Sequence, residues 1–466
     1  MVLPLETYIE QNKQKFEDDL CELLRIPSVS TDSQFADDVH RAATWIVERL
    51  KVNGFETKLI ETCGHPIVYA ETPPVEGAPT VLVYGHYDVQ PPDPLDQWTT
   101  PPFEPEVRDG NLYARGATDD KGQVLTHIFS AEAWKQTHDS FPVQIKFLIE
   151  GEEECGSKGL WEFLDGKYDD AVGREVSDLI DCDVVVISDG SMYGPGQPAI
   201  TYGLKGISYF ELRLKGPSQD LHSGAFGGSV TNPANALTQI LAKLIDENGR
   251  VQIPGFYDDV IDISDQERKQ FADLNFDDQE YMNSIGVDGL TGEEGYTTLE
   301  RRWARPTFDI NGLWSGYQGE GAKTVLPAEA GAKFSCRLVA NQDPKTIFDS
   351  LEKFIEQNCP SGIKFELVDM HGARGVTVPL DSPFMEAAAN AIEKGFGTRP
   401  CFIRTGGSIP VVTAFTEKLG VDTLLLGWGQ DDDNMHSPNE KFSLSDFQRG
   451  IAASAQLWAE LGQLNV

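Results

Sequence analysis

The sequence predicts an α/β protein of two domains, one of which is inserted into the other. Its 466 residues exceed the ~250–300 residues at which a single hydrophobic core stops growing. Short, mostly apolar runs alternate with helical patterns near both ends of the chain, as in a sheet covered by helices on both faces. The middle of the chain instead alternates apolar and polar residues, which is typical of strands with one face in water.

The outer domain is predicted from residues 1–206 and 377–466. Its apolar runs are short enough for buried strands, and its longer segments repeat apolar residues at helical spacing. The expected strands are residues 80–84, 143–149, 184–187 and 422–426. The expected helices are residues 5–25, 36–53, 121–135, 382–395 and 443–461. This pattern predicts a mixed, largely parallel sheet between helices.

Residues 207–376 are predicted to form a smaller inserted α+β domain. Residues 207–214 and 331–338 alternate like half-exposed strands, and residues 232–247 and 344–357 have helical patterns. The stretch 255–300 is acidic and follows no clear period, so the sequence assigns it no structure and no role.

Composition and charge exclude several classes of partner. The formal net charge of −36 argues against nucleic acids and anionic membrane surfaces, which bind Lys/Arg patches. We find no signal peptide and no run of ~18 apolar residues. The seven cysteines are scattered without a CxxC pair, so a disulfide framework or a thiolate zinc site is not expected. These features predict a cytoplasmic protein with reduced thiols.

Metal-type side chains follow four of the expected strands. His86, the run Glu152–Glu154 and Asp189 follow the first three, and His436 follows the late strand. Ligands in open α/β sheets bind beyond the carboxyl ends of the strands, so these groups are expected to meet there. Asp119 stands just before a predicted helix, where the helix dipole favours a carboxylate. Taken singly, each residue could be a loop, cap or turn residue, but their joint occurrence indicates a metal site.

The spacing within these segments suits a two-metal centre. His86 and Asp88 are two residues apart in an extended segment, so His86 can bind a metal while Asp88 accepts its other ring N–H. Glu153 and Glu154 are neighbours that point apart, so one can bind metal while the other acts as general base. A carboxylate that bridges two cations would complete a hydrolytic site. Imidazole and carboxylate ligands suit zinc, with manganese as a substitute.

Taken together, the motifs resemble the aminoacylase, carboxypeptidase G and carnosinase family of dinuclear metallopeptidases. The resemblance runs through nearly the whole chain in order and within the family points to the carnosinase-like cytosolic nonspecific dipeptidases. The segments that carry it in the outer domain are 85–91, 115–122, 153–154, 188–189 and 435–438. Those that point to the carnosinase-like branch are 220–224, 323–327, 334–339 and 406–410.

The resemblance implies a role for each metal-type residue. Asp119 would bridge two divalent ions, His86 and Asp189 would hold one ion, and Glu154 and His436 would hold the other. Asp88 would orient His86, and Glu153 would be the general base that activates the bridging water. The family also implies a cis peptide bond between Asp119 and Asp120.

The resemblance implies a phosphorylase/hydrolase-like mixed sheet between helices in the outer domain, and it implies that the inserted domain is the lid and dimerisation domain of the family. The resemblance implies a homodimer in which His222 stabilises the oxyanion in the partner subunit's site. Arg337 would bind the terminal carboxylate of the substrate, and Thr324 and Ser408 would complete the carboxylate and backbone contacts. The alternatives are a simple turn at His222 and a surface salt bridge at Arg337.

The implied activity is metal-dependent hydrolysis of dipeptides or other short peptides. Thr405 departs from the carnosinase-like pattern, which commonly has an acid at this position, and Cys155 follows Glu154 where Ser is common. The first departure puts recognition of the amino end of the substrate in question. The alternative is an N-acyl amino acid deacylase of the acetylornithine or succinyl-diaminopimelate type, because its amide substrates would use the same metal core.

Overall fold

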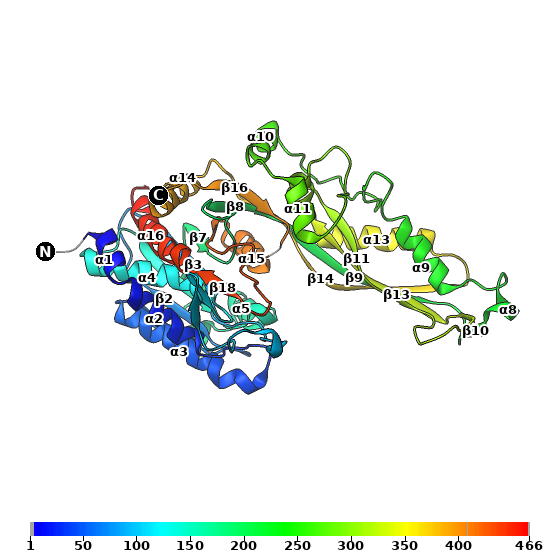
Figure 1. Ribbon diagram of the computed structural model, residues 1–466, viewed down its shortest axis with the longest axis horizontal. Helices are drawn as coiled ribbons and strands as arrows, with labels where there is room; N and C mark the ends of the chain where they lie inside the picture. The colour runs from blue at the N-terminus through cyan, green and yellow to red at the C-terminus, as the bar shows by residue number, and fades with distance from the viewer. Residues whose placement is uncertain (1–3, 408, 465–466) are drawn as a thin grey trace. The chain divides into compact units, whose positions relative to one another are not determined.

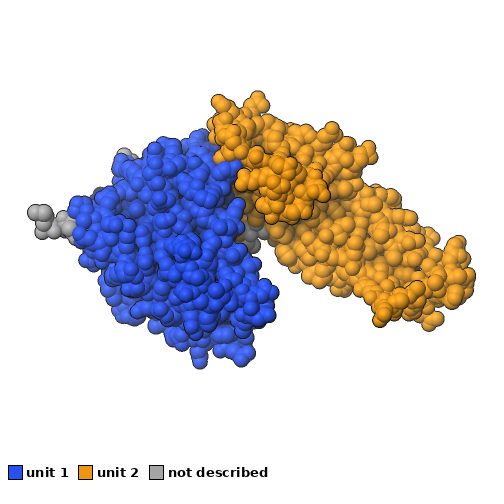
Figure 2. Space-filling model, in the orientation of Figure 1, with its two compact units in different colours: residues 1–202, 378–403, 415–466 blue, residues 203–377, 404–414 orange. Residues whose placement is uncertain are grey.

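The computed structural model describes residues 4–407 and 409–464, and these form two compact units, coloured separately in Figure 2. Unit 1 contains the described parts of Met1–Tyr202, Val378–Ile403 and Phe415–Val466. Unit 2 contains the described parts of Gly203–Thr377 and Arg404–Ala414. The chain therefore leaves the first unit, builds the second and returns.

A mixed sheet forms the centre of unit 1, as the sequence predicts. Its strand order is β1-β2-β6-β3-β7-β17-β8, and β3, β6, β7 and β17 run parallel to one another. The other three strands pair antiparallel. The bounds are β1 Glu56–Ile60, β2 Ile67–Glu71, β3 Thr80–His86, β6 Gln144–Glu150, β7 Val184–Ile187, β8 Ala199–Leu204 and β17 Asp422–Gly427. Every residue of β6 is buried, so apolar side chains stand at both odd and even positions of this strand.

Helices cover both faces of this sheet. Tyr84 and Gly85 are consecutive in β3 and so point to opposite faces. A Cβ at Gly85 would lie 2.5 Å from Val124 of α4, whereas the Tyr84 ring packs edge-on against Phe415 of α15. On the α4 side, α4 packs against α1, α2 and α16, and α16 packs against α14.

The helices of unit 1 largely follow the apolar periodicity of the sequence. The main difference is that the pattern over residues 5–25 forms two helices that meet at Asn12, which caps the end of the first. The bounds are α1 Leu5–Gln11, α2 Lys13–Leu24, α3 Ala36–Val52, α4 Lys121–Thr137, α5 Lys158–Leu164, α6 Asp169–Val172, α7 Val176–Ile180, α14 Pro383–Phe396 and α16 Leu444–Leu461. A further helix, α15 Pro410–Leu419, begins in unit 2 and ends in unit 1. A small sheet adds β4 Glu106–Arg108, β5 Asn111–Tyr113 and β18 Lys441–Ser443.

Unit 2 is built on a four-stranded antiparallel sheet in the order β11-β13-β9-β14. The helices α9 and α13 pack on this sheet (Figure 1). The strands are β9 Gly206–Lys215, β11 Thr307–Ser315, β13 Glu329–Leu338 and β14 Lys364–Ala373. The helices are α8 Ser223–Phe226, α9 Pro233–Ala242, α10 Asp265–Asp273, α11 Asp278–Ile285, α12 Thr298–Ala304 and α13 Pro344–Asn358. The shorter strands are β10 Leu221–His222, β12 Val325–Leu326, β15 Val376–Thr377 and β16 Cys401–Thr405.

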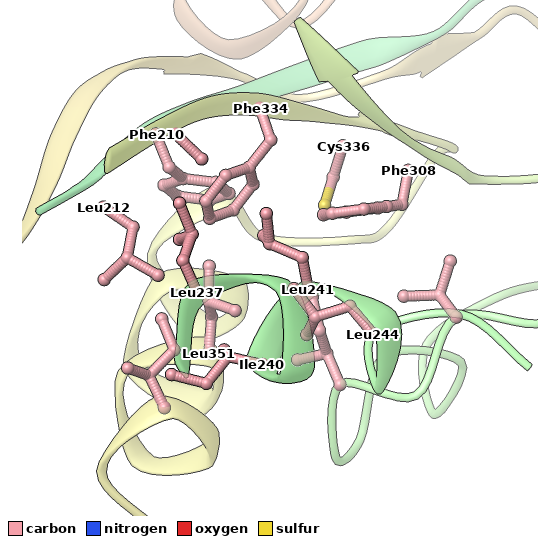
Figure 3. Packing of buried hydrophobic residues seen from close by; sticks show 14 of the residues in the cluster. Phe210, Leu212, Leu237, Ile240, Leu241, Leu244, Phe308, Phe334, Cys336 and Leu351 are labelled. Carbon is pink, nitrogen blue, oxygen red and sulfur yellow. The ribbon is translucent and has the colours of Figure 1, made fainter. Parts of the chain in front are cut away.

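One apolar core holds the sheet and helices of unit 2 together. Figure 3 shows Phe210 and Phe334 of adjacent strands facing Leu237 and Leu241 of α9. Leu351 of α13 joins the same cluster and is fully buried. The alternation of the strands thus places one face of the sheet in this core.

The acidic stretch that follows no period is held by charged and aromatic groups. Glu293 is buried and accepts hydrogen bonds from Arg305 at 2.7 and 2.8 Å and from Arg250 at 2.8 Å. The Arg305 guanidinium also lies 4.3 Å from the centre of the Tyr296 ring. Because such contacts leave no regular apolar pattern, periodicity could not reveal α10, α11 and α12.

Residues 404–414 belong to unit 2, although the sequence placed them in the outer domain. Arg404 forms an ion pair with Glu267 of α10, the Thr405 carbonyl accepts from the Lys205 backbone N–H at 3.3 Å, and Thr413 donates to the Arg374 carbonyl at 3.0 Å. These polar contacts leave no sequence pattern. Within residues 4–407 and 409–464, no helix is long and apolar enough to cross a membrane.

Candidate active site

Four parallel strands deliver the candidate ligands of unit 1 to one edge of the sheet. His86 is the last residue of β3, and Asp189 stands two residues after β7. Glu154 lies in a short 3-10 turn after β6, and His436 lies in the loop between β17 and β18. Since these strands run parallel, their carboxyl ends lie on the same side, as the sequence predicts.

The side chains form two groups that share Asp119. One group contains His86, Asp119 and Asp189, and the other contains Asp119, Glu154 and His436. Within each group the candidate ligand atoms lie within 4.8 Å of one another. His86 Nε2 is 3.1 Å from Asp119 Oδ1, and His436 Nε2 is 2.8 Å from Asp119 Oδ2. The two carboxylate oxygens of Asp119 therefore face different imidazoles, which is the arrangement of a bridging ligand.

The backbone around Asp119 brings its carboxylate to the end of β3. The Asp119–Asp120 peptide bond is cis, as the resemblance implies. Asp120 is fully buried, and its Oδ2 accepts a hydrogen bond from the backbone N–H of His86 at 3.1 Å. A Cβ at Gly85 would stand 2.7 Å from that same oxygen, so this close approach requires glycine at the end of β3.

Asp88 holds both the first imidazole and the turn that carries the two glutamates. Its Oδ1 lies 3.3 Å from His86 Nδ1, as the spacing of two residues predicts. Its carboxylate also accepts from the backbone N–H groups of Glu153 at 3.2 Å and Glu154 at 3.1 Å. The sequence did not predict this second set of contacts. Gln90, also not predicted, donates to Glu154 Oε2 at 2.8 Å.

The cluster is strongly charged, and hydrogen bonds set the protonation of its imidazoles. Burial alone would lower the pKa of His86, but hydrogen bonds to Asp119 and Asp88 raise it well above the usual value. Hydrogen bonds to Asp119 and Glu154 raise the pKa of His436 to about 10. Because a metal ligand must lose its proton, cations that bind to this cluster would release protons.

The carboxylates of the cluster are perturbed in opposite directions. Burial would raise the pKa of Asp119, but its hydrogen bonds with His436 and His86 hold it below the usual value. Burial raises the pKa of Asp189 to about 8, and the charge of Asp119 adds to this effect. Burial also raises the pKa of Glu153 to about 7, although the charge of His86 opposes the shift. Strongly perturbed groups in one cluster are typical of functional sites.

Two of the candidate residues in unit 2 lie together. His222 ends β10, which pairs with β12, and the Ser223 backbone N–H donates to the Thr324 carbonyl at 3.2 Å. His222 is exposed, and its Nδ1 accepts from the Gly224 backbone N–H at 3.0 Å. Since Nδ1 is an acceptor, the neutral ring carries its proton on Nε2, which is free to donate outward.

Arg337 lies in the four-stranded sheet of unit 2, at the end of β13 that is far from the His222 hairpin. It is half-buried near the end of β13, opposite Thr307 of β11 and Ile207 of β9. The beginning of β13, at Glu329, lies near the hairpin that carries His222, because Asp220 accepts from the Ala328 backbone N–H at 3.0 Å. Ser408, the remaining candidate, lies outside the described residues.

A family profile described as Peptidase family M20/M25/M40 matches residues 82–460 of the chain. The chain belongs to this family. The Cys-Gly metallodipeptidase of Candida albicans is 36% identical over 96% of this chain and 94% of its own length. The human Beta-Ala-His dipeptidase is 35% identical over 86% of this chain and 78% of its own length.

Solved structures of this M20 family share the fold of the chain. The structure of the di-peptidase Dug1p from Saccharomyces cerevisiae superposes with a TM-score of 0.79 at 32% identity, covering 99% of this chain and 98% of the other. Human carnosine dipeptidase 1 gives the same values. These relatives agree with the predicted family, with its carnosinase-like branch and with the α/β fold.

Proposed function

We propose that this chain is a metal-dependent dipeptidase that hydrolyses the peptide bond of dipeptides and other short peptides. The observation that carries the proposal is the pair of three-residue groups joined by Asp119. The relatives named as metallodipeptidases, at about 35% identity over most of the chain, support the substrate class.

The side chains of the cluster fit two divalent cations. His86 and Asp189 would hold one cation, Glu154 and His436 the other, and Asp119 both. Among the described residues, the buried Glu154 Oε1 has no hydrogen-bond partner, as expected of an oxygen that would bind a cation. Imidazole and carboxylate donors suit zinc, with manganese as the alternative. When bound, the cations would polarise the scissile carbonyl group and lower the pKa of the attacking water.

Glu153 is the proposed general base. It is the first residue of the 3-10 turn after β6, directly before Glu154, and it is outside both three-residue groups. Asp88 accepts a hydrogen bond from the backbone N–H of Glu153, which fixes the backbone from which the Glu153 side chain extends. Glu153 would take a proton from the attacking water and then give it to the leaving nitrogen.

Residues of two subunits are proposed to complete the site. Arg337 and the His222 hairpin lie at opposite ends of β13, and the eight residue-to-residue steps from Glu329 to Arg337 span about 26 Å in a β-strand. This distance is several times the length of a dipeptide, so His222 and Arg337 of one chain cannot hold the same substrate. In a homodimer, Arg337 would bind the terminal carboxylate in its own site, with Ser408 contributing there as the family implies. His222 and Thr324 would serve the partner's site, where the Nε2–H of His222 would stabilise the oxyanion.

An assay of metal-depleted protein tests the proposal. The protein is stripped with a chelator, supplied separately with zinc or manganese, and offered a dipeptide, a tripeptide and an N-acetyl amino acid. We expect hydrolysis of dipeptides only after metal is restored. Turnover of N-acetyl amino acids alone would instead make the chain a deacylase, which Thr405 at the position of a common acid would explain. Unchanged turnover after chelation would contradict the metal centre.

A further inference from the structure

The candidate ligand His436 lies on an irregular loop whose backbone adopts an uncommon conformation at several residues. The His436 side chain is 56% exposed, and its backbone adopts a left-handed conformation with φ of 60°. Asn434 and Asn439 in the same loop also have positive φ, at 57° and 61°. Residues other than glycine rarely adopt this left-handed conformation. A loop with three of them therefore needs contacts with other segments to hold one shape.

Glu440 supplies such a contact from a fully buried position at the end of the loop. Its Oε1 accepts from the backbone N–H groups of Thr118 at 3.0 Å and Asp119 at 3.1 Å. Its Oε2 accepts from the Gly116 backbone N–H at 2.9 Å and from Arg115 at 2.7 Å. Both oxygens are thus committed to the segment that carries Asp119, and Glu440 is not itself within either group of candidate ligands.

Further contacts close the His436 loop around this carboxylate. The Lys441 backbone N–H donates to the Asp433 carbonyl at 3.0 Å, which joins the two ends of the loop. The buried Asp433 carboxylate accepts from the Thr118 hydroxyl at 3.0 Å. Asn439 accepts from the Thr99 backbone N–H at 2.8 Å, which ties the same loop to a second segment.

We infer that Glu440 is a positioning residue that locks the loops of Asp119 and His436 together and so sets the geometry of the metal site. One carboxylate accepts four N–H donors from residues 115–119, while its own backbone lies four residues from His436. The inference rests on the metal centre proposed above. It assigns Glu440 no contact with the cations or the substrate.

The physical reason is the cost of replacing this acceptor. Glu440→Gln would turn one oxygen into an NH₂ group that faces N–H donors, and it would leave the buried Arg115 without its counter-charge. The segment of Asp119 and the loop of His436 would then be free to move apart. Residues that orient metal ligands in this way typically change metal affinity by ~10–100-fold when they are replaced.

Metal affinity tests the inference directly. Zinc and manganese are titrated by calorimetry into chelator-treated wild-type protein, Glu440→Gln and Glu440→Asp, and circular dichroism reports whether each metal-free variant is folded. We expect affinity for at least one equivalent to fall by ~10–100-fold in Glu440→Gln, with a smaller loss in Glu440→Asp. The aspartate keeps the charge but reaches fewer donors, so it carries the test if the glutamine variant does not fold.

Glu132→Gln is the matched control. Glu132 is also a buried carboxylate of unit 1, but it accepts from Lys15 at 2.7 Å and Asn53 at 3.5 Å, away from the candidate ligands. We expect this variant to keep the metal affinity of the wild type. Wild-type affinity in a folded Glu440 variant, or an equal loss in Glu132→Gln, would overturn the inference. Failure of the wild type itself to bind metal would instead overturn the proposed function.

Discussion

The two units present their candidate residues in contrasting ways. In unit 1, His86, Asp119 and His436 bind one another at 2.8–3.1 Å, and the backbone of the surrounding turns is held by buried carboxylates. In unit 2, His222 is exposed at the end of a two-residue strand, beside the four-residue helix α8 (Figure 1). The contrast indicates that one chain can hold the proposed metal ligands in place by itself, whereas the proposed oxyanion contact of His222 would need a partner subunit.

The largest expected effect separates chemistry from metal binding within unit 1. Glu153→Gln removes the proposed base while leaving both groups of candidate ligands intact. We expect kcat to fall by about 10²–10⁴-fold, with the metal content unchanged by elemental analysis. Glu153→Asp, which keeps the carboxylate on a shorter side chain, is the control and should retain part of the activity. Full turnover in Glu153→Gln would remove the base assignment.

The second prediction tests whether His222 of unit 2 acts on the partner subunit's site. Loss of one oxyanion donor typically lowers kcat by about 10²–10³-fold, and we expect this for His222→Gln. Because the side chain is exposed and, among the described residues, accepts a hydrogen bond from the nearby Gly224 N–H, the melting temperature should barely change. A normal kcat would favour the alternative that this segment is a simple turn.

Mixed dimers make the same test sharper. Glu153→Gln and His222→Gln should each have little activity alone. A dimer that contains one chain of each variant has one intact site if His222 acts across subunits. An equal mixture that re-equilibrates should recover about a quarter of wild-type activity. If His222 acted within its own chain, both sites of the mixed dimer would be damaged and no activity would return.

A smaller effect is expected at Arg337, at the opposite end of β13 from the His222 hairpin. Arg337→Met should raise KM and lower kcat/KM by about 10–100-fold, because one charged partner of the substrate carboxylate is lost. Dipeptides with an amidated carboxyl end should be equally poor substrates for both proteins. A variant that still prefers free carboxylates over amides would show that Arg337 has another role, such as a surface salt bridge.

The sequence was sufficient where regular patterns determine structure. Strands β3, β6 and β7 follow from short apolar runs, and because parallel strands end together, the meeting of His86, Glu154 and Asp189 could be predicted. The edge strand β1 and its neighbour β2 were not predicted. In β1 only Ile60 is fully buried, so the strand lacks the alternation that would reveal it.

Contacts between polar residues that are far apart along the chain could not be predicted from the sequence. Glu440 lies more than three hundred residues from Thr118, and no pattern links them before the chain is folded. The same holds for the Arg404 ion pair with Glu267, which explains the misplacement of residues 404–414. The proposed role of His222 in the partner subunit's site came from the family resemblance. The length of β13 in the structure then supplied a physical argument for it.

The smallest expected effect concerns Lys205, a buried lysine of unit 2. Lys205 is 3% exposed and donates to the Arg301 carbonyl at 2.8 Å. Burial, with the charge of Arg337, lowers the pKa of Lys205 to about 7. The unfolded chain keeps the usual pKa near 10.4. Between these values the unfolded state binds more protons, so Lys205 makes the free energy of unfolding rise with pH.

Lys205→Met should remove this dependence. Relative to the variant, wild-type protein should gain up to about 1.4 kcal/mol of stability per pH unit between pH 7 and 10, and little below pH 7, where both states are protonated. Urea unfolding of chelator-treated proteins measures the difference, since titration of the metal ligands is common to both. Lys215→Met is the control, because Lys215 is 64% exposed. A pH-independent difference for Lys205→Met would mean that the amine stays charged in the folded unit, and that unit 2, like unit 1, supplies its buried charges with partners.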